Sequence, residues 1–297
     1  MGEAPAPRAQ APSRGTLRGV RGGGPEGAAA AWGAAGAPTG APWGPRGRAF
    51  VLGGTSLVGK VLLQGANRVQ VHGRSHWLAA VLARPPGRGL MTVSNHVSTF
   101  DDPFLVSAML PWAFFLTEPQ HGLTRWAMCA EDVCFRNKFF NAWLLNGKVL
   151  PVVRGAGLKQ PVLDKASELL QRGDWVHVFP EGGIVRTGSL GPLKWGTAKA
   201  LCGAADNPPL VVPMYHRGNQ EIMPKGAVLP RTGRTTTVVV GEPVDLGDLL
   251  LQCKRAHGPK AKERAYVKIM DRIEVAMKEL EAPCMQRHAE ATAGEAH

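Results

Sequence analysis

The stretch LMTVSNHVSTFDDP, residues 90 to 103, passes from an apolar segment through a polar loop to a proline. Residues 90 to 93 predict a buried strand, and residues 103 to 110 predict a helix with Asp102 as its N-cap and Pro103 at its first position. The same alternation continues along the chain, with predicted strands at 149–153, 175–179, 210–214 and 235–240, and predicted helices at 160–171, 193–201 and 263–280. We therefore predict an α/β fold with a central mixed, largely parallel sheet flanked by helices.

His96 and Asp101 lie in the loop between the first predicted strand and helix. Residues five apart on one helix would face different sides, so a contact between them requires a loop. There the Asp101 carboxylate can accept the N–H of one ring nitrogen and leave the other nitrogen to take a proton from a hydroxyl. In isolation, a capping aspartate beside a structural histidine explains the spacing at least as well. A second histidine, His216, follows another predicted strand, and we expect it to be structural.

Two further predicted strands also end in polar residues. GKVLPVVRG, residues 147 to 155, brings Arg154 to a strand end, where a guanidinium can fork a phosphate. WVHVFPEGG, residues 175 to 183, ends in a turn in which the Glu181 carboxylate can accept from hydroxyls and the N–H of Gly182 can face an anion. A surface arginine and a solvated turn glutamate are the simpler explanations of each block on its own.

The formal net charge of +12 predicts attraction to a polyanion, either nucleic acid or an anionic membrane. The chain has only two tyrosines and no RRM, zinc-finger or KH pattern to organise its Lys and Arg, so we do not expect nucleic-acid binding. No run reaches the roughly 18 apolar residues that a membrane-spanning helix needs. We therefore expect peripheral or monotopic membrane association.

The composition divides the chain into four predicted regions. Residues 1 to 48 are rich in Gly, Ala and Pro and carry six Arg but two Glu, which predicts a disordered tail and fits both an organellar targeting peptide and an untargeted segment. Residues 49 to 82 predict an interfacial, membrane-associating helical segment, because their apolar side chains gather on one helical face near basic residues. Residues 83 to 283 form the predicted catalytic domain, and residues 284 to 297 a disordered C-terminus.

Two other features predict no chemistry. The five cysteines are scattered without CxxC spacing, so we expect free thiols rather than a disulfide framework, and no metal site: Cys129, Cys134, Cys202, Cys253 and Cys284. GTSLVGKV, residues 54 to 61, has the glycines and lysine of a phosphate-binding loop, but Val61 occupies the place of the Ser or Thr that would hold magnesium. We therefore do not expect nucleotide hydrolysis.

Taken in order, the polar blocks resemble those of the glycerolipid acyltransferase superfamily. The resemblance runs from about Val69 to Val244 and rests on SNHVSTFDDP, GKVLPVVRG, GDWVHVFPEG, LKWG and VVPMYHRGNQEIMP. Many CoA-dependent members follow the F-P-E-G block with Thr and Arg, whereas Gly183 and Ile184 follow it here. This departure resembles the branch that moves acyl chains between phospholipids and lysophospholipids and remodels mitochondrial cardiolipin.

The resemblance implies a glycerol-3-phosphate acyltransferase-like fold and a role for each site residue. His96 would deprotonate the free hydroxyl of a lysophospholipid, and Asp101 would orient the ring and balance its charge. Arg154, Glu181 and Gly182 would hold the glycerophosphate part of the lipid. Because one ester is exchanged for another, the reaction is nearly isoenergetic, and we expect neither a metal nor another cofactor.

The implied partners are membrane phospholipids and lysophospholipids, and the implied location is a mitochondrial membrane. Two alternatives remain open at this point. One is a lysophospholipid acyltransferase of the lysophosphatidate type that uses acyl-CoA. The other is a catalytically silent membrane-binding protein that keeps the fold.

Overall fold

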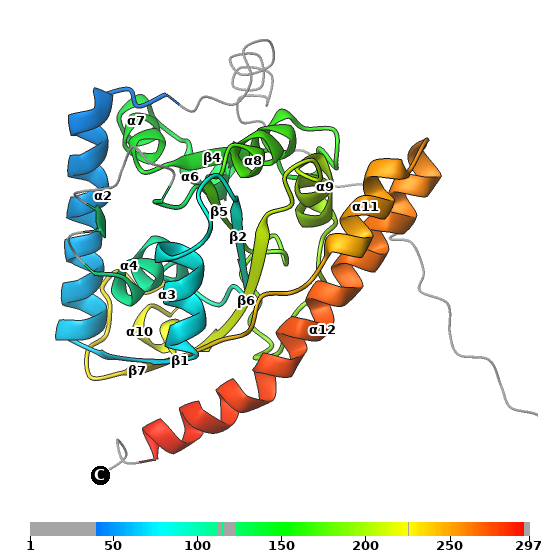
Figure 1. Ribbon diagram of the computed structural model, residues 1–297. Helices are drawn as coiled ribbons and strands as arrows, with labels where there is room; N and C mark the ends of the chain where they lie inside the picture. Colours follow the sequence, from blue (N-terminus) through cyan, green and yellow to red (C-terminus); the bar gives the residue numbers. More distant parts are fainter. Residues whose placement is uncertain (1–39, 112–113, 116–122, 225, 294–297) are drawn as a thin grey trace, which may run out of the picture.

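The computed structural model describes residues 40–111, 114–115, 123–224 and 226–293 (Figure 1). Two sheets lie between layers of helices. The strands are β1 (Arg68–His72), β2 (Leu90–Ser94), β3 (Ala127–Ala130), β4 (Val149–Val152), β5 (Trp175–Val178), β6 (Leu210–Arg217) and β7 (Thr235–Val240). The helices are α2 (Gly44–Lys60), η1 (Val61–Gly65), α3 (Arg74–Leu82), η2 (Asp101–Leu105), α4 (Val106–Met109), α6 (Glu131–Cys134), α7 (Lys138–Asn146), α8 (Pro161–Gln171), α9 (Gly196–Gly203), α10 (Asn219–Ile222), α11 (Gly247–Arg255) and α12 (Pro259–Thr292).

The main sheet has the strand order β1-β7-β6-β2-β5. β1 and β7, β6 and β2, and β2 and β5 pair in parallel, whereas β6 and β7 pair antiparallel. The second sheet consists of the parallel strands β3 and β4, and a bridge from Trp126 to Val176 connects it to β5. The predicted mixed, largely parallel sheet flanked by helices is therefore confirmed.

Side chains alternate between two hydrophobic clusters because successive residues of a strand face opposite sides of the sheet. On one face, Met91 and Val211 pack with α8, α9, α11 and α12. On the opposite face of the sheet, Leu90 and Val212 pack with α2, α3 and α4. β2 and β5 are buried along their whole length, as expected for parallel strands covered on both faces.

The carboxyl ends of β5, β2 and β6 lie at one edge of the sheet because these three strands are parallel and adjacent. Loops that leave this edge carry Glu181 after β5, His96 after β2 and Asn219 after β6. In open α/β sheets, ligands bind outside the carboxyl ends of the strands. The topology thus collects chemically active side chains from three distant parts of the sequence.

Helix α2 lies along one side of the molecule, with α7 beside its N-terminal part (Figure 1). An aromatic cluster joins the two helices: the ring of Trp43 lies 5.6 Å from that of Phe139 and 6.2 Å from that of Trp143, and Phe50 lies 6.4 Å from Trp143. The P-loop-like residues 54 to 61 belong to α2 and the start of η1, so they form helix rather than a phosphate-binding loop. Across the described ranges, no helix combines the length and the apolar character needed to cross a bilayer.

Several predicted boundaries are wrong. Residues 44 to 48 of the expected disordered tail are helical, whereas residues 1 to 39 lie outside the described part of the chain. The expected disordered C-terminus begins inside α12, which continues to Thr292 because Cys284 and His288 are buried against the sheet. The expected helical segment 49 to 82 contains β1, an edge strand whose polar residues hide its alternation.

The predicted helix at 103 to 110 is also different. It begins with η2, followed by a short α4 that ends at Met109. Asp102 does not cap it, because Asp102 lies inside η2, whose N-cap position is Phe100, and its carboxylate pairs with Arg125. Arg125 comes from a distant segment, so local sequence could not reveal this competing partner.

The expectation of five free thiols is wrong for four of them. Disulfides join Cys129 to Cys134 and Cys202 to Cys253, whereas Cys284 is free and buried. Cys202 lies on α9 and Cys253 on α11, and these two helices pack together. This juxtaposition arises from tertiary packing, and a separation of 51 residues gives no motif that would reveal it.

Candidate active site

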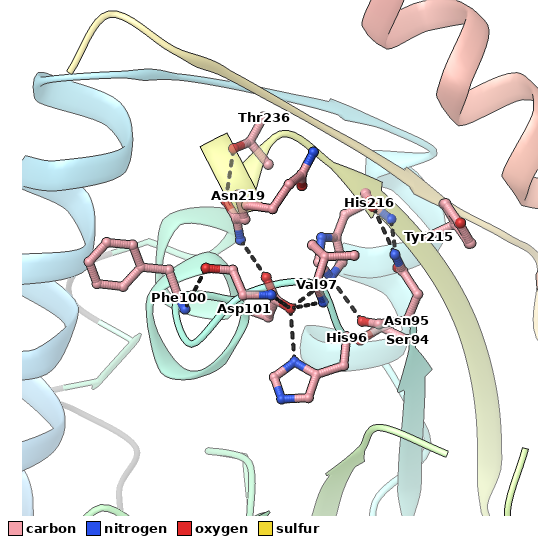
Figure 2. Close-up of polar contacts among 12 residues, drawn as sticks. Ser94, Asn95, His96, Val97, Phe100, Asp101, Tyr215, His216, Asn219 and Thr236 are labelled. Atoms are coloured by element: carbon pink, nitrogen blue, oxygen red, sulfur yellow. Dashed lines mark hydrogen bonds and ion pairs between the residues drawn. The ribbon is translucent and has the colours of Figure 1, made fainter. Parts of the chain in front are cut away.

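His96 and Asp101 form a hydrogen-bonded pair in the loop after β2. The Nδ1 atom of His96 lies 2.9 Å from Oδ2 of Asp101 (Figure 2). The Asp101 side chain is fully buried, whereas 19% of the His96 side chain is exposed. No hydrogen bond joins Nε2 of His96 to another residue in the described ranges. The charged Asp101 carboxylate accepts a hydrogen bond from Nδ1 of His96, so the neutral ring carries its proton on Nδ1. The lone pair of Nε2 is then available to a ligand.

The Asp101 carboxylate is held by several donors. Its Oδ2 atom also accepts the backbone N–H groups of Val97 at 2.7 Å and Ser98 at 2.8 Å. Burial alone would raise the pKa of the Asp101 carboxyl, but the neighbouring His216 and His96 rings and the Ser98 N–H outweigh it and hold that pKa below its usual range. The loop therefore keeps an ionised carboxylate directly behind the exposed imidazole.

Residues after β6 support the same carboxylate from the other side. Asn219 donates from Nδ2 to Oδ1 of Asp101 at 3.0 Å, and its own Oδ1 accepts from the Thr236 hydroxyl at 2.8 Å. Asn95 and His216 exchange two hydrogen bonds of 2.9 Å, each between the Asn95 side chain and the His216 backbone. These contacts tie the end of β2 to the end of β6. His216 is fully buried, and its Nε2 atom lies 3.0 Å from the carbonyl oxygen of Asn95.

Glu181 supports His96 through the backbone. Its Oε2 atom accepts the N–H of His96 at 2.6 Å, and its Oε1 atom accepts the N–H of Gly191 at 2.7 Å. The side chain is buried, which raises the pKa of the carboxyl, although the two N–H donors oppose that shift. Gly182 has φ of +69° and its N–H donates to the carbonyl of Phe179. The turn after β5 thus holds the histidine loop, and both Glu181 oxygens are already used within the protein.

The His96 ring also packs on this turn. It stacks on Phe179 with ring centroids 4.0 Å apart and planes inclined by 12°. Behind it, His177 on β5 hydrogen bonds through Nδ1 to the Thr92 hydroxyl at 2.7 Å. Burial lowers the pKa of His177 to about 3, so this ring is neutral at physiological pH and serves the core. The stacked Phe179 and the Asp101 contact together restrict His96 to one orientation.

Arg154, the other basic residue predicted for the site, lies in the loop after β4. Its Nη1 atom lies 3.2 Å from Oδ2 of Asp132, and both side chains are more than half exposed. β4 belongs to the second sheet, and the structure provides no contact between Arg154 and the His96–Asp101 pair among the described residues. His96, Asp101, Glu181 and Gly182 are therefore brought together, whereas Arg154 is not.

A groove of about 530 Å³ is lined from Val97 onward, next to His96 in the chain, although His96 and Asp101 are not themselves among its lining residues. One wall is formed by Val97 to Thr99, which follow His96, and another by residues 184 to 188, which follow the Glu181 turn. The N–H of Val185 donates to the carbonyl of His96 at 2.8 Å and so joins these walls. Arg186 and Arg217 also line the groove, together with apolar side chains such as Met223. The groove can accommodate an amphiphile with an anionic group.

Sequence reasoning missed four contributors to this region: Asn219, Thr236, Arg186 and Arg217. Asn219 and Arg217 lie in VVPMYHRGNQEIMP, a block in which only His216 was considered as a site residue. Arg186 comes five residues after Glu181, in a segment between Gly183 and Gly188 whose path the sequence does not determine. Thr236 lies in the run Thr235–Val240, in which a buried hydroxyl gives no sequence signal.

Comparison with known proteins assigns the chain to a class. The family model described as Acyltransferase matches residues 68–217, which contain the whole His96–Asp101–Glu181 arrangement. The chain therefore belongs to the acyltransferase family of enzymes, within the glycerolipid acyltransferase superfamily.

Its similarity to particular members is specific. It is 35% identical over 243 residues to tafazzin from Drosophila melanogaster, covering 81% of this chain and 62% of the fly protein. It is 37% identical over 207 residues to N-acylphosphatidylethanolamine synthase from Arabidopsis thaliana, covering 67% of this chain and 70% of the plant protein. The chain thus spans less than two thirds of the fly tafazzin.

A solved structure confirms the fold. The 1-acyl-sn-glycerophosphate acyltransferase from Thermotoga maritima superposes with a TM-score of 0.50 at 22% identity, covering 79% of this chain and 80% of that one. At this identity the similarity concerns the architecture.

Proposed function

We propose that this chain is a CoA-independent phospholipid–lysophospholipid transacylase in which His96 and Asp101 activate the acceptor hydroxyl. The observation that carries the proposal is the buried carboxylate at Nδ1 of His96, combined with a partly exposed ring in the loop that continues into the wall of the groove. The similarity to tafazzin supports this branch of the family over the acyl-CoA-dependent alternative.

The proposed chemistry is one base-catalysed acyl exchange. Nε2 of His96 takes the proton of the lysophospholipid hydroxyl, and the oxygen attacks the acyl carbonyl of a donor phospholipid. Asp101 stabilises the imidazolium that forms. When the tetrahedral intermediate collapses, the glycerol oxygen of the donor leaves and takes the proton back from His96. One ester bond forms and one breaks, so the proton balance closes without another reactant.

Glu181 acts in this proposal as a positioning residue and not as a substrate ligand. Its two oxygens accept from His96 and Gly191, which fixes the backbone that carries the base. Gly182 belongs to the same turn. For the phosphate group of the lipid, Arg186 and Arg217 in the groove are the supported partners. The phosphate-binding role predicted for Arg154 is not part of this proposal, because Arg154 pairs with Asp132 and does not line the groove.

The face formed by α2 and α7 supports association with an anionic membrane. Trp43, Phe50, Leu57 and Val61 recur at steps of seven, seven and four and are exposed, as are Phe139 and Phe140 on α7. Exposed Arg46 and Lys138 flank them. An apolar stripe with basic neighbours lies in the interface of a bilayer rather than across it. We define this set as the α2–α7 face and propose it as the peripheral membrane contact.

We extend the proposal to cardiolipin remodelling at a mitochondrial membrane. The similarity to tafazzin supports this, and the basic charge of the chain suits a lipid with two phosphates. Targeting by the N-terminal tail is part of the same proposal.

The Arabidopsis relative favours a second candidate, transfer of the acyl chain to the amine of phosphatidylethanolamine. The same base would remove a proton from the attacking amine. The product would be an amide instead of an ester, and mild alkali separates the two because it cleaves only esters.

The deciding experiment uses purified protein with acyl-labelled phospholipid in liposomes. One arm receives lysophospholipid without CoA, a second phosphatidylethanolamine, and a third acyl-CoA with lysophosphatidate. We expect alkali-labile label on the lysophospholipid in the first arm, abolished in His96→Ala and reduced strongly in Asp101→Asn. Alkali-stable product in the second arm favours the amine acceptor, and turnover only with acyl-CoA favours the CoA-dependent alternative.

The same variants test for a catalytically silent protein. Equal liposome association by wild type and His96→Ala, with transfer detectable in none of the arms, would support that interpretation and overturn the transacylase proposal.

A further inference from the structure

We infer that Asn219 is a positioning residue for this transfer: it holds the Asp101 carboxylate that orients His96, and Thr236 holds Asn219 in turn (Figure 2). The inference rests on the proposed function, but it concerns a different set of contacts. Asn219 and Thr236 lie outside H-x4-D and F-P-E-G, and both are fully buried.

The hydrogen bonds to Asp101 are unevenly divided between its oxygens. Oδ2 accepts from the His96 ring and from the Val97 and Ser98 backbones. Within the part of the chain that the structure describes, Asn219 supplies the one hydrogen bond to Oδ1. Figure 2 shows the amide and the imidazole reaching Asp101 from different sides. Asn219 therefore fixes the second oxygen and, together with the Val97 and Ser98 N–H groups at Oδ2, limits the rotation of the carboxylate that would turn Oδ2 away from Nδ1.

The direction of the amide follows from chemistry. An ionised carboxylate only accepts hydrogen bonds, so the NH2 group of Asn219 must face Asp101. The amide oxygen then faces away and needs a donor, because a buried unpaired carbonyl is costly. The Thr236 hydroxyl on β7 meets this need at 2.8 Å. Thr236 thus satisfies the amide oxygen and holds Asn219 in the orientation that the carboxylate dictates, without touching Asp101.

The backbone places Asn219 close to β7. Gly218, directly before it, has φ of +108°, and a Cβ there would lie 2.1 Å from the carbonyl oxygen of Thr235. Only glycine permits this close approach and this backbone conformation. The turn after β6 is therefore fitted to the neighbouring strand, which carries Thr236.

Other charged or titratable groups around Asp101 do not replace this contact. His96 and His216 approach Oδ2, at 2.9 and 3.8 Å, and Asp102 is turned to Arg125. Glu181 and His177 influence the site electrostatically and have their own partners. Loss of the Asn219 donor would leave a less stabilised carboxylate, which protonates at a higher pH.

The experiment compares Asn219→Leu, Thr236→Val and Thr236→Ser with wild type. Leu removes the amide at similar size, Val removes the hydroxyl at similar shape, and Ser retains the hydroxyl. We measure kcat and KM in the CoA-free exchange assay across pH, together with the 13C titration of the Asp101 carboxyl in detergent micelles, assigned with Asp101→Asn.

For Asn219→Leu we expect kcat to fall about 10- to 100-fold with KM unchanged, as is typical of a misplaced catalytic group. The carboxyl titration of Asp101 should move to higher pH, because the ionised form has lost one of its hydrogen-bond donors. Thr236→Val should also lower kcat and move the Asp101 carboxyl titration to higher pH, but by less than Asn219→Leu. Thr236→Ser should match wild type in both measurements.

A carboxyl titration that stays at its wild-type position in both Asn219→Leu and Thr236→Val, or a kcat that does not fall in Asn219→Leu, would overturn the inference. Equal defects in Thr236→Val and Thr236→Ser would do the same. If Asn219→Leu does not fold, the two Thr236 variants decide. If wild type shows no exchange, the proposed function fails, while the carboxyl titration still tests the Asn219 contact.

Discussion

The backbone N–H of His96 donates to Oε2 of Glu181 at 2.6 Å, although 85 residues separate them in the chain. The F-P-E-G turn therefore contributes to the site by holding the histidine loop. Its second oxygen holds Gly191, so a single carboxylate connects the loop after β2 to the segment before α9.

We expect Glu181→Gln to lower kcat because the amide can accept from only one of these two donors, leaving the other facing an NH2 group. A slight displacement of the base should cost about 10- to 100-fold. Exchange kinetics check this, with Glu168→Gln on the exposed surface of α8 as the matched control. Wild-type kcat in Glu181→Gln would show that the contact does not position His96.

The groove makes a prediction about which arginines bind phosphate. Arg186→Leu and Arg217→Leu should raise KM for anionic lipids by about 10- to 100-fold each, the effect of losing a charged hydrogen bond. Arg154→Leu should leave KM unchanged, since that side chain pairs with Asp132. The opposite pattern, with KM raised by Arg154→Leu alone, would transfer phosphate binding to the loop after β4.

The α2–α7 face makes a prediction about membrane association. Phe50→Ser with Phe139→Ser removes two side chains that are 68% and 69% exposed in the free protein. Burying a phenylalanine contributes about 1.5–3 kcal/mol, so binding to anionic liposomes should weaken at least about tenfold in a sedimentation assay. Val275→Ser on the exposed side of α12 is the matched control. Equal binding by the double variant and the control would place the membrane contact elsewhere.

Lys148 predicts an unusual pH dependence of stability. It is buried, donates to the carbonyl of Thr124 and lies over the Trp126 ring; burial lowers its pKa to about 7. Between about pH 7 and pH 9 the unfolded lysine carries a proton that the folded one has lost, so the free energy of unfolding should rise with pH. Denaturant unfolding across this range should show a flatter slope in Lys148→Met. An identical slope in both proteins would contradict the lowered pKa.

The sequence predicted the α/β class because the central strands are short apolar runs between strong turn signals. It also predicted the approach of Asp101 to His96, but only together with the other polar blocks and the family resemblance, because the spacing alone fitted a capping aspartate equally well. β1 was missed because Arg68, Gln70 and His72 alternate with its valines at a sheet edge. The sequence predicted the apolar helical stripe of the α2–α7 face. It did not predict the pairing with α7, because that pairing depends on aromatic contacts between distant segments.

The remainder of the site depends on tertiary contacts that no motif encodes. Glu181 was found, but its partners were not, because a backbone N–H has no sequence signature. Asn219 and Thr236 join the site only because β6 and β7 are neighbours in the sheet.

The parallel pairing of β1 with β7 has a consequence for biosynthesis. The edge strand β1 can pair with β7 only after almost the whole catalytic domain has been translated. Helix α2, which precedes β1, emerges from the ribosome long before that partner exists. The sheet that carries the candidate active site is therefore complete only when synthesis has passed Val240, late in the chain.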